Sequence, residues 1–155
     1  MIMDTLKIIL FAVVVGLLAN ANVYATDNSA LPGPVKSVYD HYLKIQASLA
    51  DDSLNGVAEN ADAIAKAVQG DAKTFPAEVG TQADALAKAK DLETARGAFK
   101  PLSDALIKYL ADNKAKDAYV QVYCPMAKAS WLQADKNVKN PYLGQAMSEC
   151  GEIQN

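Results

Sequence analysis

Apolar residues recur every three or four positions along two stretches in the first half of the chain, a period typical of helices with one buried face. The first stretch follows breaker residues at 31–34, and its inward positions are Val35, Val38, Tyr39, Tyr42, Ile45 and Leu49. The second follows a turn at 51–53 and ends at Gly70, with the inward positions Leu54, Val57, Ala58, Ala61, Ile64, Ala65 and Val68. Each stretch predicts one long helix.

A third stretch with the same period runs from about 91 to 113. Its inward positions are Leu92, Ala95, Phe99, Leu102, Leu106, Tyr109 and Leu110. Between the second and third stretches the period fails around Phe75, Pro76 and Gly80, and residues 82–88 favour only a short helix. Three long helices joined by short loops predict a mainly α fold, an antiparallel helical bundle.

The pattern changes beyond Lys116. Residues 118–124 alternate and are rich in β-branched and aromatic side chains, which predicts a short strand that Pro125 ends. Trp131 and Leu132 then form a small apolar anchor. We therefore expect the bundle to carry a strand-containing C-terminal segment.

Asn140 and Pro141 favour the start of a last short helix. Asparagine is a good N-cap, and proline is tolerated in the first turn because the N–H it lacks has no partner there. This helix is expected to run to about Cys150 and to be closed by Gly151.

The first 25 residues have the pattern of a signal peptide. Residues 8–18 are an uninterrupted apolar stretch, shorter than the roughly 20 residues that a membrane-spanning helix needs. Small residues follow it, with Val23 and Ala25 spaced as a signal-peptidase site requires. We expect cleavage after Ala25, with cleavage after Ala21 or an uncleaved anchor as the alternatives.

The remaining chain, residues 26–155, is then expected to be a single domain that is periplasmic or secreted, in an oxidising compartment. The net charge of the whole chain is −3 with no long run of either sign, so nucleic acid is not an expected partner, and no membrane insertion is expected after signal removal.

One histidine and two cysteines exclude a His-rich metal cage, a four-cysteine zinc site and an iron–sulfur ligand set. The sequence has no glycine-rich phosphate loop and no nucleophile elbow, so we expect no enzyme activity.

Sulfur-containing side chains are concentrated in the C-terminal segment. After signal removal the chain retains Cys124, Met126, Met147 and Cys150. Residues two apart in a strand lie on one side of it, and residues three apart in a helix share a face, so each pair is expected to point one way. If the two elements face each other, two thiolates and two thioethers converge, a ligand set that suits Cu(I) or Ag(I) better than Zn(II).

The same cysteines also favour a structural disulfide, because disulfides form and persist in oxidising compartments. A bond from Cys124 to Cys150 would stabilise a small domain by about 3.5 kcal/mol in the chain-entropy model. Oxidation consumes both thiolates, so the metal site and the disulfide are alternative states, and the sequence leaves both open.

The C-terminal segment also resembles a known family. The string Cys124-Pro125-Met126-Ala127, then Trp131, then Asn140-Pro141-Tyr142 with Gly144, Met147 and Cys150-Gly151 is similar to the signature of the domain of unknown function 3347. Residues 38–53 and 91–110 are similar to the helices of that family, the latter through Ala98-Phe99-Lys100-Pro101-Leu102-Ser103. Such domains occur as secreted single-domain proteins and on periplasmic adaptor subunits of copper- and silver-type heavy-metal efflux pumps.

The resemblance implies an exported module that binds a heavy metal, with Cu(I) the first expectation, or that is accessory to periplasmic metal homeostasis. Efflux-pump components are then the expected partners. The alternative is a metal-independent protein-interaction module that contains a structural Cys124–Cys150 disulfide.

Overall fold

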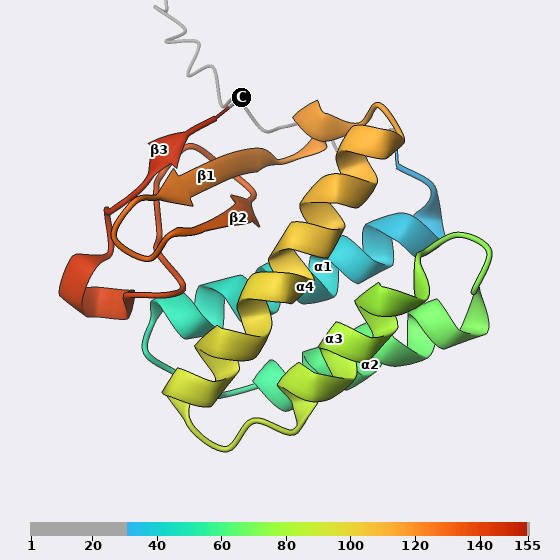
Figure 1. Cartoon of the computed structure of the whole chain (residues 1–155), viewed down its shortest axis with the longest axis horizontal. Helices are drawn as coiled ribbons and strands as arrows, with labels where there is room; N and C mark the ends of the chain where they lie inside the picture. The colour runs from blue at the N-terminus through green and yellow to red at the C-terminus, as the bar shows by residue number, and fades with distance from the viewer. Residues whose placement is uncertain (1–30, 155) are drawn as a thin grey trace, which may run out of the picture.

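The computed structural model describes residues 31–154 as a mainly helical fold that carries a small sheet at one end (Figure 1). The helices are α1 (Gly33–Ala50), α2 (Val57–Gly70), α3 (Ala77–Ala87) and α4 (Leu92–Asp112). The sheet contains β1 (Val120–Cys124), β2 (Ala129–Gln133) and β3 (Glu152–Ile153), with the 3-10 helices η2 (Lys116–Ala118) and η3 (Gly144–Met147) before β1 and before β3. The predicted signal peptide lies outside the described residues, and within them no helix is long and apolar enough to cross a membrane.

The helices pack around one apolar core, to which the three periodic stretches contribute. The predicted inward position Ala58 is an exception, because it is exposed. In space α2 lies between α1 and α3, and α3 also packs on α4. The rings of Tyr42 in α1 and Phe99 in α4 stack with centroids 4.9 Å apart. The Tyr39 hydroxyl donates a hydrogen bond of 2.8 Å to the Leu106 carbonyl, which ties α1 to α4 a second time.

The predicted bundle of three long helices is incomplete, because α3 is a fourth member of the helical layer. It begins at Ala77 rather than at residue 82, directly after Pro76, which occupies the N-cap position. Gly80 lies inside the helix and is buried. The two helices are close together here, since a Cβ at Gly80 would be only 3.3 Å from Val68 of α2. The glycine that interrupts the apolar period is therefore a close-packing position of α3 on α2.

The sheet has the strand order β2-β1-β3 and is antiparallel throughout. The predicted strand is confirmed as β1, where Val122 is paired with Trp131 on one side and with Ile153 on the other. The apolar pair at Trp131 and Leu132 belongs to β2, a strand that the sequence pattern did not predict. Through β2 the sheet packs on α4 and α1, and Trp131 is completely buried there.

The predicted last helix is wrong. Residues 141–143 form a turn, η3 is a single short 3-10 helix, and Cys150 lies outside it. Gly144 has a positive φ of 56°, which is outside the α-helical region and interrupts a helical path from Asn140 to Cys150. Met147 and Cys150 consequently do not lie on one face of a common helix.

Candidate functional site

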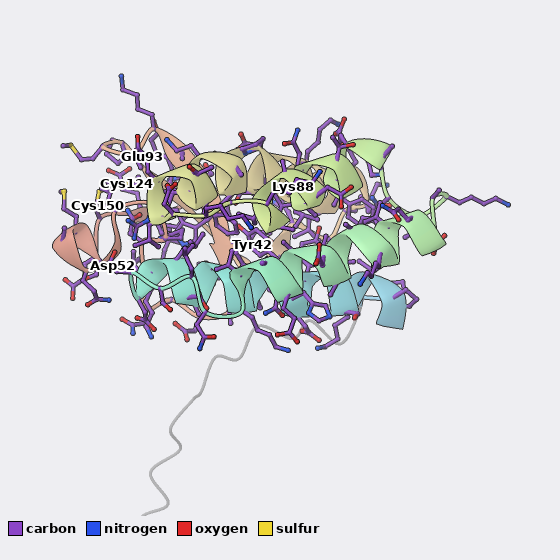
Figure 2. All side chains as sticks on the ribbon, turned by 90° about the horizontal axis from the view of Figure 1, so that it is seen from below. Tyr42, Asp52, Lys88, Glu93, Cys124 and Cys150 are labelled. Atoms are coloured by element: carbon purple, nitrogen blue, oxygen red, sulfur yellow. A yellow bond between two sulfur atoms is a disulfide. The ribbon has the colours of Figure 1, made fainter. Side chains whose placement is uncertain are left out.

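The two cysteines form a disulfide at the sheet end of the molecule, where Asp52 and Glu93 also lie (Figure 2). Cys124 is the last residue of β1 and is completely buried, and Cys150 follows η3 and is half-buried. Their Cα atoms are 5.7 Å apart, a normal separation for a disulfide. Of the two states that the sequence left open, the structure therefore contains the oxidised one.

The two methionines of the predicted ligand set flank this disulfide but do not share a side with the cysteines. Because β1 ends at Cys124 and residues 125–128 form a turn, strand alternation does not extend to Met126. Met126 is 66% exposed and Met147 is 42% exposed, whereas Cys124 is buried. The prediction that Cys124 and Met126 share one side of a strand, and that Met147 and Cys150 share one face of a helix, is wrong. Both methionine side chains are open to solvent, and the two cysteines form a disulfide.

Asn140 fixes the loop that brings Cys150 to Cys124. Its side chain is completely buried, and its Oδ1 accepts hydrogen bonds of 2.8 and 2.9 Å from the N–H groups of Tyr142 and Leu143. Its Nδ2 donates a bond of 2.7 Å to the Cys150 carbonyl. The capping role that the sequence predicted is therefore present, but it organises a loop that turns back to Cys150 instead of a helix.

A charged cluster attaches this loop to the helices. The Arg96 guanidinium of α4 forms an ion pair with Asp52 of the α1–α2 connection and donates bonds of 2.9 Å to the carbonyls of Leu49 and Pro141. Asp52 also accepts a bond from the backbone N–H of Gln145. The hydrogen bonds from Arg96 and from Gln145 hold the pKa of Asp52 below its usual range, so this carboxylate stays ionised and keeps both partners.

Buried hydroxyl groups form a third attachment, between the sheet and the bundle. The Tyr42 and Ser103 hydroxyls are 2.8 Å apart, and the Tyr42 oxygen accepts a bond from the Leu132 N–H of β2. The Tyr142 hydroxyl donates a bond of 2.6 Å to the Ser130 carbonyl. Burial raises the pKa values of Tyr42 and Tyr142 well above the ordinary value, so both hydroxyls remain protonated donors.

The described residues contain no group of three or more histidine, cysteine, aspartate or glutamate side chains placed to hold a metal ion. The one histidine, His41, is instead hydrogen-bonded through Nδ1 to Oδ1 of Asn60 on α2 at 2.8 Å. The disulfide occupies both cysteine sulfurs, so the predicted four-sulfur ligand set requires its reduction. The four-sulfur site stays a prediction about the reduced chain.

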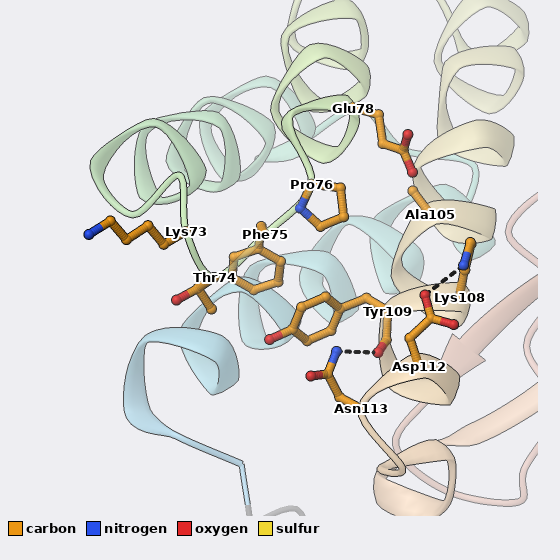
Figure 3. Close-up of a pocket in the computed structure, with 10 residues that line it drawn as sticks. All are labelled: Lys73, Thr74, Phe75, Pro76, Glu78, Ala105, Lys108, Tyr109, Asp112 and Asn113. Carbon is orange, nitrogen blue, oxygen red and sulfur yellow. Dashed lines mark hydrogen bonds and ion pairs between the residues drawn. The ribbon is translucent and has the colours of Figure 1, made fainter.

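A hollow of about 370 Å³ lies at the other end of the bundle, between the α2–α3 connection and the C-terminal end of α4 (Figure 3). The rings of Phe75 and Tyr109 stack in it with centroids 4.6 Å apart. Burial and the nearby charge of Asp71 raise the pKa of Tyr109. On the rim, Lys108 and Asp112 form an ion pair with each other. The ring contact packs the α2–α3 connection against α4, and we assign no binding or catalytic function to this hollow.

The sequence reasoning did not identify the roles of Asp52, Arg96 and Lys100. Each makes long-range contacts with the C-terminal segment or with the loop beside it. On the helical pattern alone Arg96 and Lys100 are indistinguishable from the other charged residues of a solvated face, and Asp52 lies in the predicted turn at 51–53. The one available signal was Lys100, which stands in the string that resembles the family helix.

One of the comparisons with known proteins gives a match. The model of a family described as "Protein of unknown function (DUF3347)" matches residues 38–118, from within α1 to the end of η2. No curated protein and no solved structure matches the chain. The matched range covers the helical layer and ends before Cys124, so the sulfur-containing segment is interpreted from its own geometry.

Proposed function

This chain belongs to the DUF3347 family of proteins of unknown function, and from that premise we propose that it is an exported protein-interaction module stabilised by the Cys124–Cys150 disulfide. Its setting is periplasmic heavy-metal homeostasis, and its partners are efflux-pump components of the copper and silver type. The setting rests on the resemblance of the sequence to such pump-associated domains. Export is supported by the signal-peptide pattern and by the disulfide, which is rare in reducing compartments.

The disulfide is the observation that carries this proposal. It joins the end of β1 to the segment after η3, so the two ends of the loop between them are tied together by a covalent bond. The bond also occupies both sulfurs, which leaves the oxidised protein without a thiolate ligand. A rigid surface without a strong metal ligand fits a binding role, and the sequence contains no catalytic motif that points to an enzyme.

The oxidised state predicts a specific mass and thiol content for the protein isolated from its native compartment. We expect a chain that begins at Thr26, or at Asn22 if cleavage follows Ala21. Without reductant an alkylating reagent should add nothing, and after reduction in denaturant it should add two groups, because both cysteines are in the one disulfide. Intact-mass spectrometry measures both properties. A full-length mass beginning at Met1, or thiols that react without reduction, would contradict export and the disulfide respectively.

Direct binding to a partner tests the function itself. The oxidised protein is titrated into a purified periplasmic adaptor subunit of a copper- or silver-type pump by calorimetry, with and without a copper chelator. Binding that the chelator leaves unchanged supports the proposal. Binding that the chelator abolishes overturns the metal-independent role, and absence of binding under both conditions overturns the partner assignment.

Cu(I) binding by the reduced protein is a second candidate function. The observation that favours it is the placement of two exposed thioethers, Met126 and Met147, within three residues of the cysteines. Reduction would release two thiolates beside these soft donors, and thiolate with thioether sulfur suits monovalent copper. Cys124, Met126, Met147 and Cys150 remain the proposed ligands in that state.

Competition with a chromophoric Cu(I) chelator checks this second function. Reduced protein is expected to take up one Cu(I) and far less Zn(II), because thioether is a poor ligand for zinc. Cys124→Ser and Cys150→Ser should each remove most of the affinity, whereas Met126→Leu and Met147→Leu should weaken it less. The matched control His41→Ala should change little, since this histidine lies on the helical bundle. Failure of the reduced protein to compete would exclude the metal role.

A further inference from the structure

A hollow of about 660 Å³ lies between the first half of α4 and the C-terminal segment. Its volume is in the range of pockets that hold a small ligand or one anchoring side chain. It is lined from two parts of the chain that are distant in sequence, namely by Leu92, Gly97 and Lys100 of α4 and by Met126, Tyr142 and Leu143.

The apolar part of this hollow has room for a branched aliphatic side chain. Leu92 and Leu143 are half-buried, and Met126 on the rim is 66% exposed, so its flexible thioether is free to cover an occupant. Gly97 keeps the α4 side open, because a Cβ placed there would have no neighbouring atom within 4 Å. The open space therefore lies directly over the helix surface at Gly97.

Lys100 supplies the charge that the hollow presents. Its Nζ donates a bond of 2.9 Å to the Ala127 carbonyl and lies 5.6 Å from the centroid of the Tyr142 ring. An ammonium group has three N–H donors, and this carbonyl takes one of them. Arg96 also lines the hollow, but its charge is matched by Asp52. Glu93 also lines the hollow, and the Asp104 carboxylate interacts electrostatically with Lys100. Lys100 is nevertheless the lining cation that forms no ion pair among the described residues, so it is the one that complements a carboxylate in the hollow.

We propose that this hollow receives the C-terminal residue of a partner chain, with a leucine-type side chain in the apolar part and the terminal carboxylate on Lys100. The inference rests on the proposed function, because it takes a protein as the occupant. Of the exposed large apolar residues of the described part, which are Tyr123, Met126, Met147 and Ile153, Met126 lines this hollow.

Two small probes test the site without knowledge of the partner. N-acetyl-leucine has the side chain and the carboxylate, and N-acetyl-leucine amide has the same side chain without the charge. Each is titrated into the oxidised protein and followed by NMR shifts. We expect the shifts to centre on Leu92, Met126 and Leu143 and the acid to bind about two- to five-fold more tightly than the amide, as one exposed charge pair allows. Equal affinities, or shifts centred elsewhere, would overturn the proposal.

Four variants separate the charge from the space. Lys100→Met should remove the preference for the acid and leave amide binding unchanged, whereas Glu93→Gln on the rim should strengthen acid binding by removing a repulsive charge. Gly97→Leu should abolish binding of both probes, because the leucine side chain would occupy the hollow while its Cβ would have no neighbouring atom within 4 Å.

Lys66→Met is the matched control. Lys66 is an exposed lysine of α2 that does not line the hollow, so this variant should change nothing. Melting temperatures confirm that each variant is folded, and probe binding that survives Gly97→Leu in a folded protein overturns the site.

The same variants distinguish this inference from the proposed function. If Gly97→Leu abolishes binding of the adaptor subunit as well as of the probes, the hollow is the docking site. If Gly97→Leu abolishes only probe binding, adaptor docking occurs elsewhere and the inference about the hollow is overturned while the function stands. If the probes bind in the hollow and the adaptor does not bind at all, the partner assignment is overturned while the site stands.

Discussion

Loss of the Cys124–Cys150 disulfide is expected to lower the free energy of unfolding by about 3.5 kcal/mol, because the unfolded chain regains the entropy of the loop that the bond closes. For a domain of this size that corresponds to a fall in melting temperature of roughly 10 °C or more. Calorimetry of the protein with and without reductant measures the change. The cysteine-free variant Cys124→Ala/Cys150→Ala should melt near the reduced protein, since alanine keeps the buried position of Cys124 apolar.

The control for this experiment is the response to the reductant itself. The cysteine-free variant contains no bond to reduce, so reductant should leave its melting temperature unchanged. If the unaltered protein also melts at the same temperature with and without reductant, the disulfide does not stabilise the fold. The proposed function would then lose the observation that carries it, and the Cu(I) candidate would be favoured.

The three long helices were predictable because their signal is local. In α1, α2 and α4 the apolar period is set by the residues of each helix alone, and the predicted inward positions include the core residues Tyr42, Ile64 and Leu106. The true start of α3 was missed because Pro76 and Gly80 were interpreted as breakers. Pro76 precedes the helix, where it costs no hydrogen bond, and Gly80 lies where α3 closely approaches Val68.

The C-terminal segment was less predictable because long-range contacts determine its path. Strand β2 is as short as β1 but lacks its regular alternation of side chains, and it is specified by pairing with β1. The Asn140 side chain accepts hydrogen bonds from the N–H groups of Tyr142 and Leu143, as an N-cap of a helix also does. An asparagine at this position therefore does not tell a loop from the start of a helix. In the structure Gly144 has a positive φ and the Gln145 N–H bonds to Asp52, a residue from a distant part of the chain that is ion-paired with Arg96.

The pairing of the cysteines was left open for a similar reason. Two cysteines and two methionines in one segment fit both a disulfide and a soft-metal site by residue type. Both states bring Cys150 to the end of β1, where the buried bond from Asn140 to the Cys150 carbonyl helps to hold it, and they differ in the oxidation state of the two sulfurs. The residue types therefore allowed both states, and the structure contains the disulfide.

Gly144→Ala is expected to destabilise the protein by at least about 2 kcal/mol, because the new side chain meets both backbone strain and a steric clash. The φ of Gly144 is +56°, in the left-handed region that disfavours residues with a Cβ. A Cβ there would also overlap the Asp52 carboxylate and approach Arg96, so the ion pair that fixes the loop has to move. Urea unfolding measures the loss, and η3 with Met147 should become more mobile in hydrogen exchange.

Gly97→Ala is the matched control, since it makes the same chemical change on α4. This glycine has no positive φ, and a Cβ there meets no atom within 4 Å. Alanine in a helix interior is favoured over glycine by about 0.5–1 kcal/mol, so this variant should be more stable than the unaltered protein. Opposite signs for the two substitutions are the expected result, because only Gly144 lies where the C-terminal loop meets Asp52 and Arg96. Equal effects would mean that the loop is not held by this contact, and the fixed position of Cys150 would then depend on Asn140 and the disulfide alone.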